Sequence, residues 1–312
     1  MASETFVTSA PAPTPILDRF RLDRAYLGAD HRHNERRTWI VVAICTVTLA
    51  VQIGGGIAFH SMALIANGLH LSAHIVVLVA AAAAYGVSRA YAQDPRFAFG
   101  TGKVGYLVGF TNGIILGITG LLIGFESLQR VWSPQAVAYD GALELAAFAL
   151  AVNLVCVWLL KPRTAAGPDP DGDLNLTAAH LHLQADAVAS GLAILGLAAG
   201  RLWNLAWADS LAAVGGAVLV CQFAWRLLRR TGAALLDVTP SMILADDIRQ
   251  CLETDTTRVI DLHLWRLGPG HHGAIIVLKA ENPESPDVYR SRLDDLPELS
   301  HITIEVRTTT KS

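Results

Sequence analysis

Six long apolar stretches constrain the fold of this chain more than any other feature of its sequence. An α-helix needs about 20 mostly apolar residues to cross a bilayer, and each stretch has 18 residues or more. Charged residues make up only 16% of the 312-residue chain, whereas an average soluble domain has about 25%. The stretches run from Thr38 to Phe59, Met62 to Val87, Val104 to Glu126, Leu143 to Leu160, Leu174 to Ala199 and Ser210 to Leu228. We therefore predict a membrane protein with an all-α bundle of six transmembrane helices, surrounded by lipid.

Basic residues are unevenly distributed between the two sides of the predicted bundle. Cytoplasmic flanks of membrane proteins are enriched in Arg and Lys. One side has only Arg130 and Arg201, whereas the other side collects Arg36, Arg37, Arg89, Arg96, Lys103, Lys161, Arg163, Arg226, Arg229 and Arg230. Both chain ends fall on the basic side, so we expect cytoplasmic termini in a multi-pass protein of the cell inner membrane. The net charge of −3 gives no reason to expect a nucleic-acid partner.

The chain changes character after Arg230, where long apolar stretches end. Short helix and strand patterns alternate from there on: a helix at Ala245–Leu252, strands at Val259–Leu267 and Ala274–Leu278, a helix at Pro286–Leu296 capped by Ser285, and a strand at His301–Arg307. This order predicts a small α+β domain with αββαβ topology. We expect three parts: a cytoplasmic tail (1–37), a six-span transport domain (38–230) and a cytoplasmic C-terminal domain (231–312).

Two pairs of polar residues interrupt the apolar stretches at helical spacing. His70 and His74 are four residues apart in the second stretch, and His182 and Asp186 are four apart in the fifth. Residues at i and i+4 lie on one face of a helix, and ionisable groups at membrane depth are usually functional. Each residue alone would be explained as a satisfied polar group between packed helices. Together the two pairs predict a four-ligand site for a divalent cation such as Zn²⁺, Co²⁺ or Ni²⁺.

Three segments carry a resemblance to a known family: SMALIANGLHLSAH (61–74), FGTGKVGYL (99–107) and NLTAAHLHLQADAVAS (175–190). They resemble the cation diffusion facilitator family of divalent-metal exporters, and the similarity extends from HNERRTW (33–39) to ITIEV (302–306). The resemblance implies six spans, cytoplasmic termini, an αββαβ domain, and homodimers that exchange metal for protons. It also implies that the transport site is formed by His70, His74, His182 and Asp186.

The resemblance also bears on which metal is carried. The zinc pattern of the family has HxxxD on both helices, so His74 replaces an aspartate. This replacement, together with FGTGKVG, is similar to the cobalt/nickel efflux branch. The expected function is therefore proton-coupled efflux of Co²⁺ or Ni²⁺, with Zn²⁺ also possible. The alternatives are a zinc, cadmium or iron exporter of the same family, or a membrane protein that senses metal.

We also expect roles for several residues outside the transport site. Lys103 is expected to pair with Asp237 and hold the bundle and the soluble domain in register; the alternative is a lysine that only anchors the third span at the interface. His263, His271 and His301 are candidate ligands of a second metal site, or simply surface histidines. Asn67 replaces a common aspartate and is not counted as a ligand. The loop acids Asp169, Asp171 and Asp173 are expected to be a solvated acidic linker; the alternative is a loop that attracts cations weakly.

Other classes of protein remain as alternatives to a transporter. An intramembrane metalloenzyme would need a general base beside the metal, as in HExxH, and the sequence has no glutamate at such a spacing. No Walker motif is present to bind a nucleotide, and no organic cofactor is expected. The prediction is a secondary active metal/proton antiporter, not an enzyme.

Overall fold

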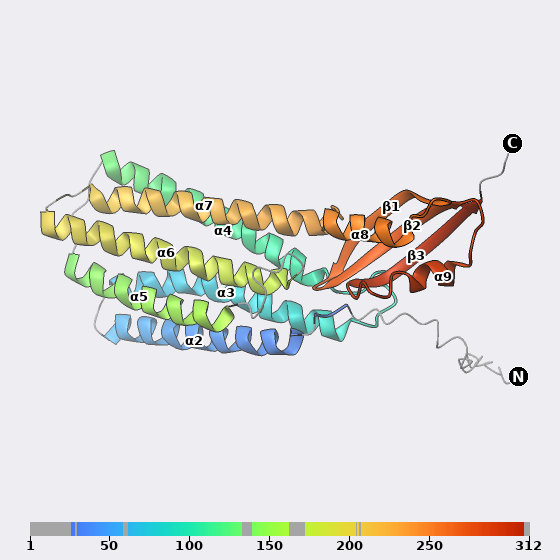
Figure 1. Cartoon of the computed structure of the whole chain (residues 1–312). Helices are drawn as coiled ribbons and strands as arrows, with labels where there is room; N and C mark the ends of the chain where they lie inside the picture. The colour runs from blue at the N-terminus through green and yellow to red at the C-terminus, as the bar shows by residue number, and fades with distance from the viewer. Residues whose placement is uncertain are drawn as a thin grey trace, which may run out of the picture.

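The computed structural model describes residues 26–28, 30–58, 62–132, 139–161, 172–203, 205 and 207–308, and within these ranges it leaves out the side chains of residues 56, 62–70, 73, 139 and 140. Six long helices lie side by side in these ranges, and a small sheet extends the molecule at one end of the bundle (Figure 1). The helices are α2 (His31–Ala58), α3 (Met62–Ala90), α4 (Val104–Trp132), α5 (Tyr139–Leu160), α6 (Leu174–Trp203) and α7 (Ala208–Leu235).

Among the described residues, five of these helices are long and apolar enough to cross a membrane, and the described segment His74–Ala90 of α3 counts as a shorter apolar helix. Together they form a membrane helical bundle, and six spans remain a prediction. The first helix begins at His31, seven residues before the predicted stretch. Its polar first turns therefore belong to a helix and not to a tail.

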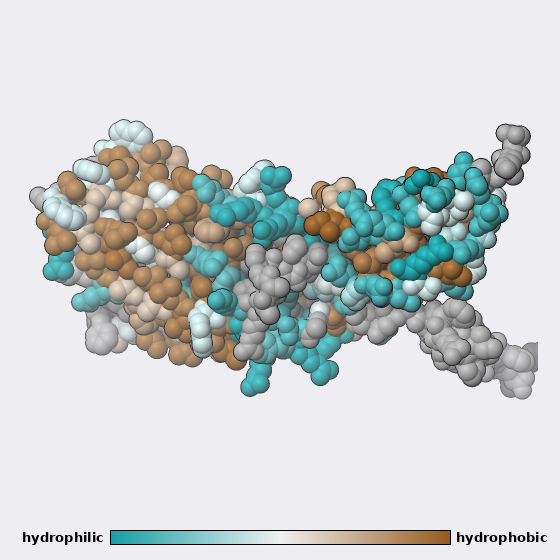
Figure 2. All heavy atoms as spheres, viewed as in Figure 1, coloured by the Kyte–Doolittle hydropathy of each residue, from teal (hydrophilic) through white to brown (hydrophobic). Residues whose placement is uncertain are grey.

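The outer surface of the bundle is apolar, as Figure 2 shows for the face in view. Large side chains such as Leu121, Phe125 and Trp158 are 64–72% exposed. Hydrophilic residues gather instead at the junction with the sheet and over the sheet itself. Because exposed leucine and phenylalanine side chains are costly in water, this distribution fits a bundle that is embedded in lipid.

Small residues let α4 and α7 approach each other closely. A Cβ on Gly120 would lie 2.9 Å from Sγ of Cys221, and a Cβ on Gly113 would lie 3.0 Å from the side chain of Leu228. Small residues at such positions are typical of helix contacts in membranes, where close van der Waals packing replaces the hydrophobic effect. The α4–α7 pair is thus a tightly packed wall of the bundle.

The C-terminal part has the predicted order of elements: α8 (Met242–Leu252), β1 (Thr257–Gly268), β2 (His271–Ala280), α9 (Pro286–Ser291) and β3 (Leu299–Thr308). The strand order is β1-β2-β3, with β1 antiparallel and β3 parallel to β2. Ile248 of α8 and Tyr289 of α9 share one buried core with Ile276 of β2. Both helices therefore pack on the same sheet.

Two details of the predicted C-terminal helices need correction. The second helix ends at Ser291 and not at Leu296, and Ser285 occupies the N-cap position without a side-chain hydrogen bond. The cap of α8 is Ser241, whose hydroxyl accepts a hydrogen bond from the backbone N–H of Leu244 at 3.2 Å.

The sheet is attached to the bundle by a close backbone crossing. The backbone of Tyr26 meets both Gly102, which precedes α4, and Gly268, at the end of β1, and the two glycines also contact each other. A Cβ on either glycine would collide with the carbonyl oxygen of Tyr26. Phe99 from the α3–α4 loop also stacks edge-on against Trp265 of β1, with ring centroids 5.4 Å apart. Residues from three distant parts of the sequence thus fix the sheet to the bundle.

Candidate metal centre

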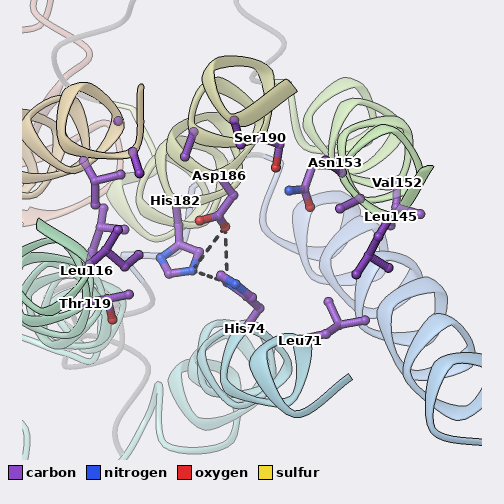
Figure 3. A pocket seen from close by; sticks show the side chains of 18 of the residues that line it. Leu71, His74, Leu116, Thr119, Leu145, Val152, Asn153, His182, Asp186 and Ser190 are labelled. Carbon is purple, nitrogen blue, oxygen red and sulfur yellow. Dashed lines mark hydrogen bonds and ion pairs between the residues drawn. The ribbon is translucent and has the colours of Figure 1, made fainter. Parts of the chain in front are cut away.

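Three of the four predicted ligands meet inside the bundle. Nδ1 of His74 on α3 lies 2.8 Å from Nε2 of His182 on α6 and 3.2 Å from Oδ2 of Asp186. The His182 nitrogen lies 3.6 Å from the same carboxylate oxygen. His182 is only 3% exposed, and Figure 3 shows all three groups pointing toward one another. They form the one group of three or more potential metal ligands among the described side chains.

The spacing of these donor atoms fits a small transition-metal ion. In a tetrahedral site with metal–ligand distances of about 2.0–2.1 Å, two ligand atoms lie about 3.3 Å apart. The observed separations of 2.8–3.6 Å bracket this value. An ion at about 2.0–2.1 Å from each donor would sit slightly outside the plane of the three atoms, which leaves a fourth position open. Two imidazoles also argue against Mg²⁺ or Ca²⁺, which prefer oxygen ligands.

The fourth predicted ligand cannot be placed in this arrangement. His70 is part of α3, four residues before His74, but its side chain lies outside the described residues, as do the side chain of Asn67 and the loop residues Asp169 and Asp171. The role of His70 stays a prediction.

The three ligands line a cavity of about 510 Å³. Its wall includes Ala142 and Leu145 from the start of α5 and Ala213 from the start of α7. Because α7 ends beside the sheet, these starting turns lie at the opposite end of the bundle (Figure 1). The cavity therefore extends from the ligands toward the end of the bundle that is distant from the sheet.

On the sheet side of the ligands, polar contacts hold the helices together. Oδ2 of Asp173 accepts hydrogen bonds from the Tyr85 hydroxyl of α3 at 2.6 Å and from the Asn34 amide of α2 at 3.1 Å. Its other oxygen accepts from the backbone N–H groups of Asn175 and Leu176 at 3.0 and 3.1 Å. Asp173 thus caps α6 and joins three helices.

Asp173 was expected to be part of a solvated acidic linker, and for this residue that expectation is wrong. An aspartate immediately before a helix is a known N-cap signal, which the sequence offered. The contacts with Tyr85 and Asn34 span 88 and 139 residues of sequence, so no local pattern could have predicted them. The amide of Asn175 adds a further link, by donating to the carbonyl oxygen of Ala81 on α3 at 2.8 Å.

The predicted histidine ligands of the C-terminal domain lie in separate environments. His263 is exposed and contacts Asp261 at 3.1 Å. Nδ1 of His271 lies 2.7 Å from the Ser300 hydroxyl, and His301 stacks edge-on against Phe99 with ring centroids 5.9 Å apart. The structure therefore gives these three histidines no common centre, and a second metal site stays a prediction.

Lys103 and Asp237 contact each other through Nζ and Oδ1, across the ends of α4 and α7. The backbone of Asp237 has φ of 56°, a left-handed conformation that is uncommon outside glycine. The N–H of Val238 donates to the Ala233 carbonyl at 3.0 Å, as in a Schellman helix end. With side chains 28% and 52% exposed, the pair is only partly shielded from solvent.

Fold and site together define the class of this molecule. An apolar helical bundle that holds two imidazoles and a carboxylate beside a cavity is the arrangement of a multi-pass membrane transporter for cations. Comparison with known proteins agrees: residues 38–236 match the cation efflux transmembrane domain. The chain belongs to the cation efflux family, and it is a transporter and not an enzyme.

Several named proteins are similar to this chain over most of their own length. The cadmium, cobalt and zinc/H(+)-K(+) antiporter of Bacillus subtilis is 26% identical, over 89% of this chain and 92% of its own. The metal cation efflux system protein CzcD of Cupriavidus metallidurans is 27% identical, over 89% and 90%. The zinc transporter ZitB of Escherichia coli is 29% identical, over 76% and 74%.

Proposed function

We propose that this protein exports divalent transition-metal ions from the cytoplasm in exchange for protons. The observation that carries the proposal is the group of donor atoms from His74, His182 and Asp186, which have the spacing and chemistry of a tetrahedral metal site. His70 would supply the fourth ligand. The metal is the transported substrate, and no organic cofactor is required.

The direction of transport follows from the proposed topology. We place six spans within residues 38–230, with both termini and the domain of residues 231–312 in the cytoplasm of a cell whose inner membrane holds the bundle. Arg and Lys concentrate at the sheet end, which supports this orientation. The cavity then faces away from the cytoplasm, and the Asp173 contacts close the cytoplasmic side.

Proton exchange follows from the chemistry of the ligands. Histidine binds metal as neutral imidazole and aspartate as carboxylate, so protons and metal compete for the same atoms. Protons that enter the cavity from outside would weaken metal binding and release the ion. A conformation open to the outside, where protons reach the site, would then bind metal less tightly than one open to the cytoplasm. Alternating access requires such a difference in affinity.

The metal remains the open part of the proposal. We favour Co²⁺ and Ni²⁺, because His74 makes the site richer in imidazole than the zinc pattern of the family. Zn²⁺ suits the same ligands, and the names of the relatives support zinc, cadmium and cobalt. An exporter of zinc, cadmium or iron is therefore the alternative, and a membrane metal sensor is a less favoured one.

We also propose that the protein works as a homodimer. A small apolar patch lies beside the Lys103–Asp237 pair, where α7 meets α8. It consists of Leu236, Val238, Met242 and Ile243, which are 53–80% exposed. Because exposed apolar side chains that gather in one place can mark a protein interface, we propose a second copy of the chain as the partner that covers them.

Transport assays in reconstituted vesicles test the proposal. Vesicles that contain the protein should take up Co²⁺, Ni²⁺ or Zn²⁺ and release protons in the opposite direction. The Asp186→Ala variant should lose both fluxes. Metal uptake without any proton movement would contradict the exchange mechanism, and metal binding without uptake would favour the sensor.

A further inference from the structure

Neutral oxygen groups line the cavity beyond the metal ligands. They come from four helices and are Thr48 and Gln52 of α2, Thr119 of α4, Asn153 of α5 and Ser190 of α6. Asn153 and Ser190 appear beside Asp186 in Figure 3. No charged side chain other than Asp186 lines the described part of this cavity. Apart from the proposed metal ligands, the wall is therefore mostly apolar, with a few uncharged polar groups.

The order of these groups follows from helix packing. Cys45 of α2 packs against Cys156 of α5 in one buried cluster. Thr48 lies three residues after Cys45, and Asn153 lies three residues before Cys156 on a helix that runs the opposite way. Thr48 and Asn153 therefore lie at one level. Gln52 lies one further turn, about 6 Å, toward the outer end of the bundle.

The hydrogen bonds of these groups occupy donor hydrogens and leave acceptor oxygens unsatisfied. The hydroxyls of Thr48 and Thr119 donate to Ile44 and Ile115 of their own helices at 2.9 Å. Their hydrogens are thus occupied, whereas their lone pairs are not. Oε1 of Gln52 has no hydrogen-bond partner among the described residues, although the residue is only 3% exposed. Acceptor oxygens attract cations and the hydrogens of water, and they repel anions.

We infer that Gln52 and Asn153 form a second, weaker cation site, which holds the exported metal together with part of its water shell. This inference rests on the proposed function. A divalent ion that leaves the histidines would otherwise enter an apolar passage, at a high cost in free energy. The cavity has room for several water molecules, each of which occupies about 30 Å³ in the liquid. Neutral amide oxygens can bind those waters without trapping the ion.

Binding measurements on the purified full-length protein test for the site, with Co²⁺ as the probe. The parent protein should show a tight and a weak class of binding in calorimetry. Gln52→Leu and Asn153→Leu should each remove the weak class and leave the tight class unchanged. Their Co²⁺ turnover in vesicles should fall about tenfold or more, the effect of losing one hydrogen bond to a charged group, with KM unchanged. Gln222→Leu is the matched control, because Gln222 is exposed on α7.

A variant that binds Co²⁺ more tightly distinguishes a change at the weak site from poor folding, because a misfolded protein would not gain affinity. Gln52→Glu keeps the size of the side chain and adds a carboxylate, so the weak class should tighten about tenfold or more. A parent protein with one class of binding, or a weak class that survives both leucine substitutions, would overturn the inference. Leucine variants that lose proton flux but keep the Co²⁺ isotherm of the parent would also overturn the inference, because Gln52 and Asn153 would then act in proton transfer and not in metal binding.

The proposed transport site is checked separately by Asp186→Ala. This variant should lose the tight class and keep the weak one. If the tight class survives in Asp186→Ala, the assignment of the transport site fails, whatever the result for Gln52 and Asn153.

Discussion

Removing the hydroxyl of Tyr85 should open the cytoplasmic side of the bundle. This hydroxyl donates to Asp173 at 2.6 Å and joins α3 to the start of α6. Tyr85 itself is only 3% exposed. In the proposed mechanism, metal reaches His182 from the sheet side, where Tyr85 and Asp173 join these helices. The contact would then break in the proposed inward-open state, where the hydroxyl would bind water instead.

The size of the effect follows from the type of bond. A hydrogen bond to a charged group stabilises a protein by about 1.5–3 kcal/mol net. If Tyr85→Phe removes that contribution from the closed state alone, the closed-to-open ratio falls by about 10- to 150-fold. The cap of α6 stays intact in this variant, because the N–H groups of Asn175 and Leu176 still donate to Asp173. Replacing Asp173 itself would remove the cap as well and confuse the two effects.

Hydrogen exchange of backbone amides measures this opening. Peptides from the start of α6 and the end of α3 should exchange at least tenfold faster in Tyr85→Phe than in the parent, because local opening sets their protection. Tyr91→Phe is the matched control, since Tyr91 is 43% exposed at the end of the same helix. Equal exchange in the two variants would refute the idea that Tyr85 and Asp173 hold this side closed.

Three further predictions concern the ligands and the charge pair. Asp186→Ala should abolish metal transport in vesicles without loss of folded, membrane-inserted protein, because a ligand is removed; transport at the parent rate would show that the site is wrongly assigned. His74→Asp should favour Zn²⁺ over Co²⁺ and Ni²⁺ in competition assays, since an anionic oxygen replaces a neutral nitrogen; unchanged relative rates would remove the case for the cobalt/nickel branch. For Lys103 and Asp237, a double-mutant cycle with Asp237→Asn, which tolerates the left-handed backbone, should give a measurable coupling of about 0.2–1 kcal/mol in dimer stability, as for exposed pairs. A coupling of zero, within error, would leave Lys103 as an interfacial anchor only.

Local sequence patterns were enough to predict the secondary structure and the helix faces that carry the candidate ligands. Apolar length located the long helices to within a few turns, because the cost of burying charge in lipid limits each stretch. The spacing of His182 and Asp186 placed them on one face of α6, because helical geometry is fixed at 3.6 residues per turn. The order of elements after Arg230 was also correct, since turns and alternating residues mark short strands.

The tertiary structure alone decided which of these groups meet. It brought His74 to His182 across 108 residues of sequence, whereas His263, His271 and His301 were placed apart. Asp173 became a partly buried helix cap that joins three helices because Tyr85 and Asn34 arrive from other helices, and a carboxylate loses less stability on burial when such donors are present. The position of the cavity, with Gln52 in its wall, likewise depends on how the helices tilt and pack. Distances between helices depend on side-chain packing along their whole length, and no single stretch of sequence contains that information.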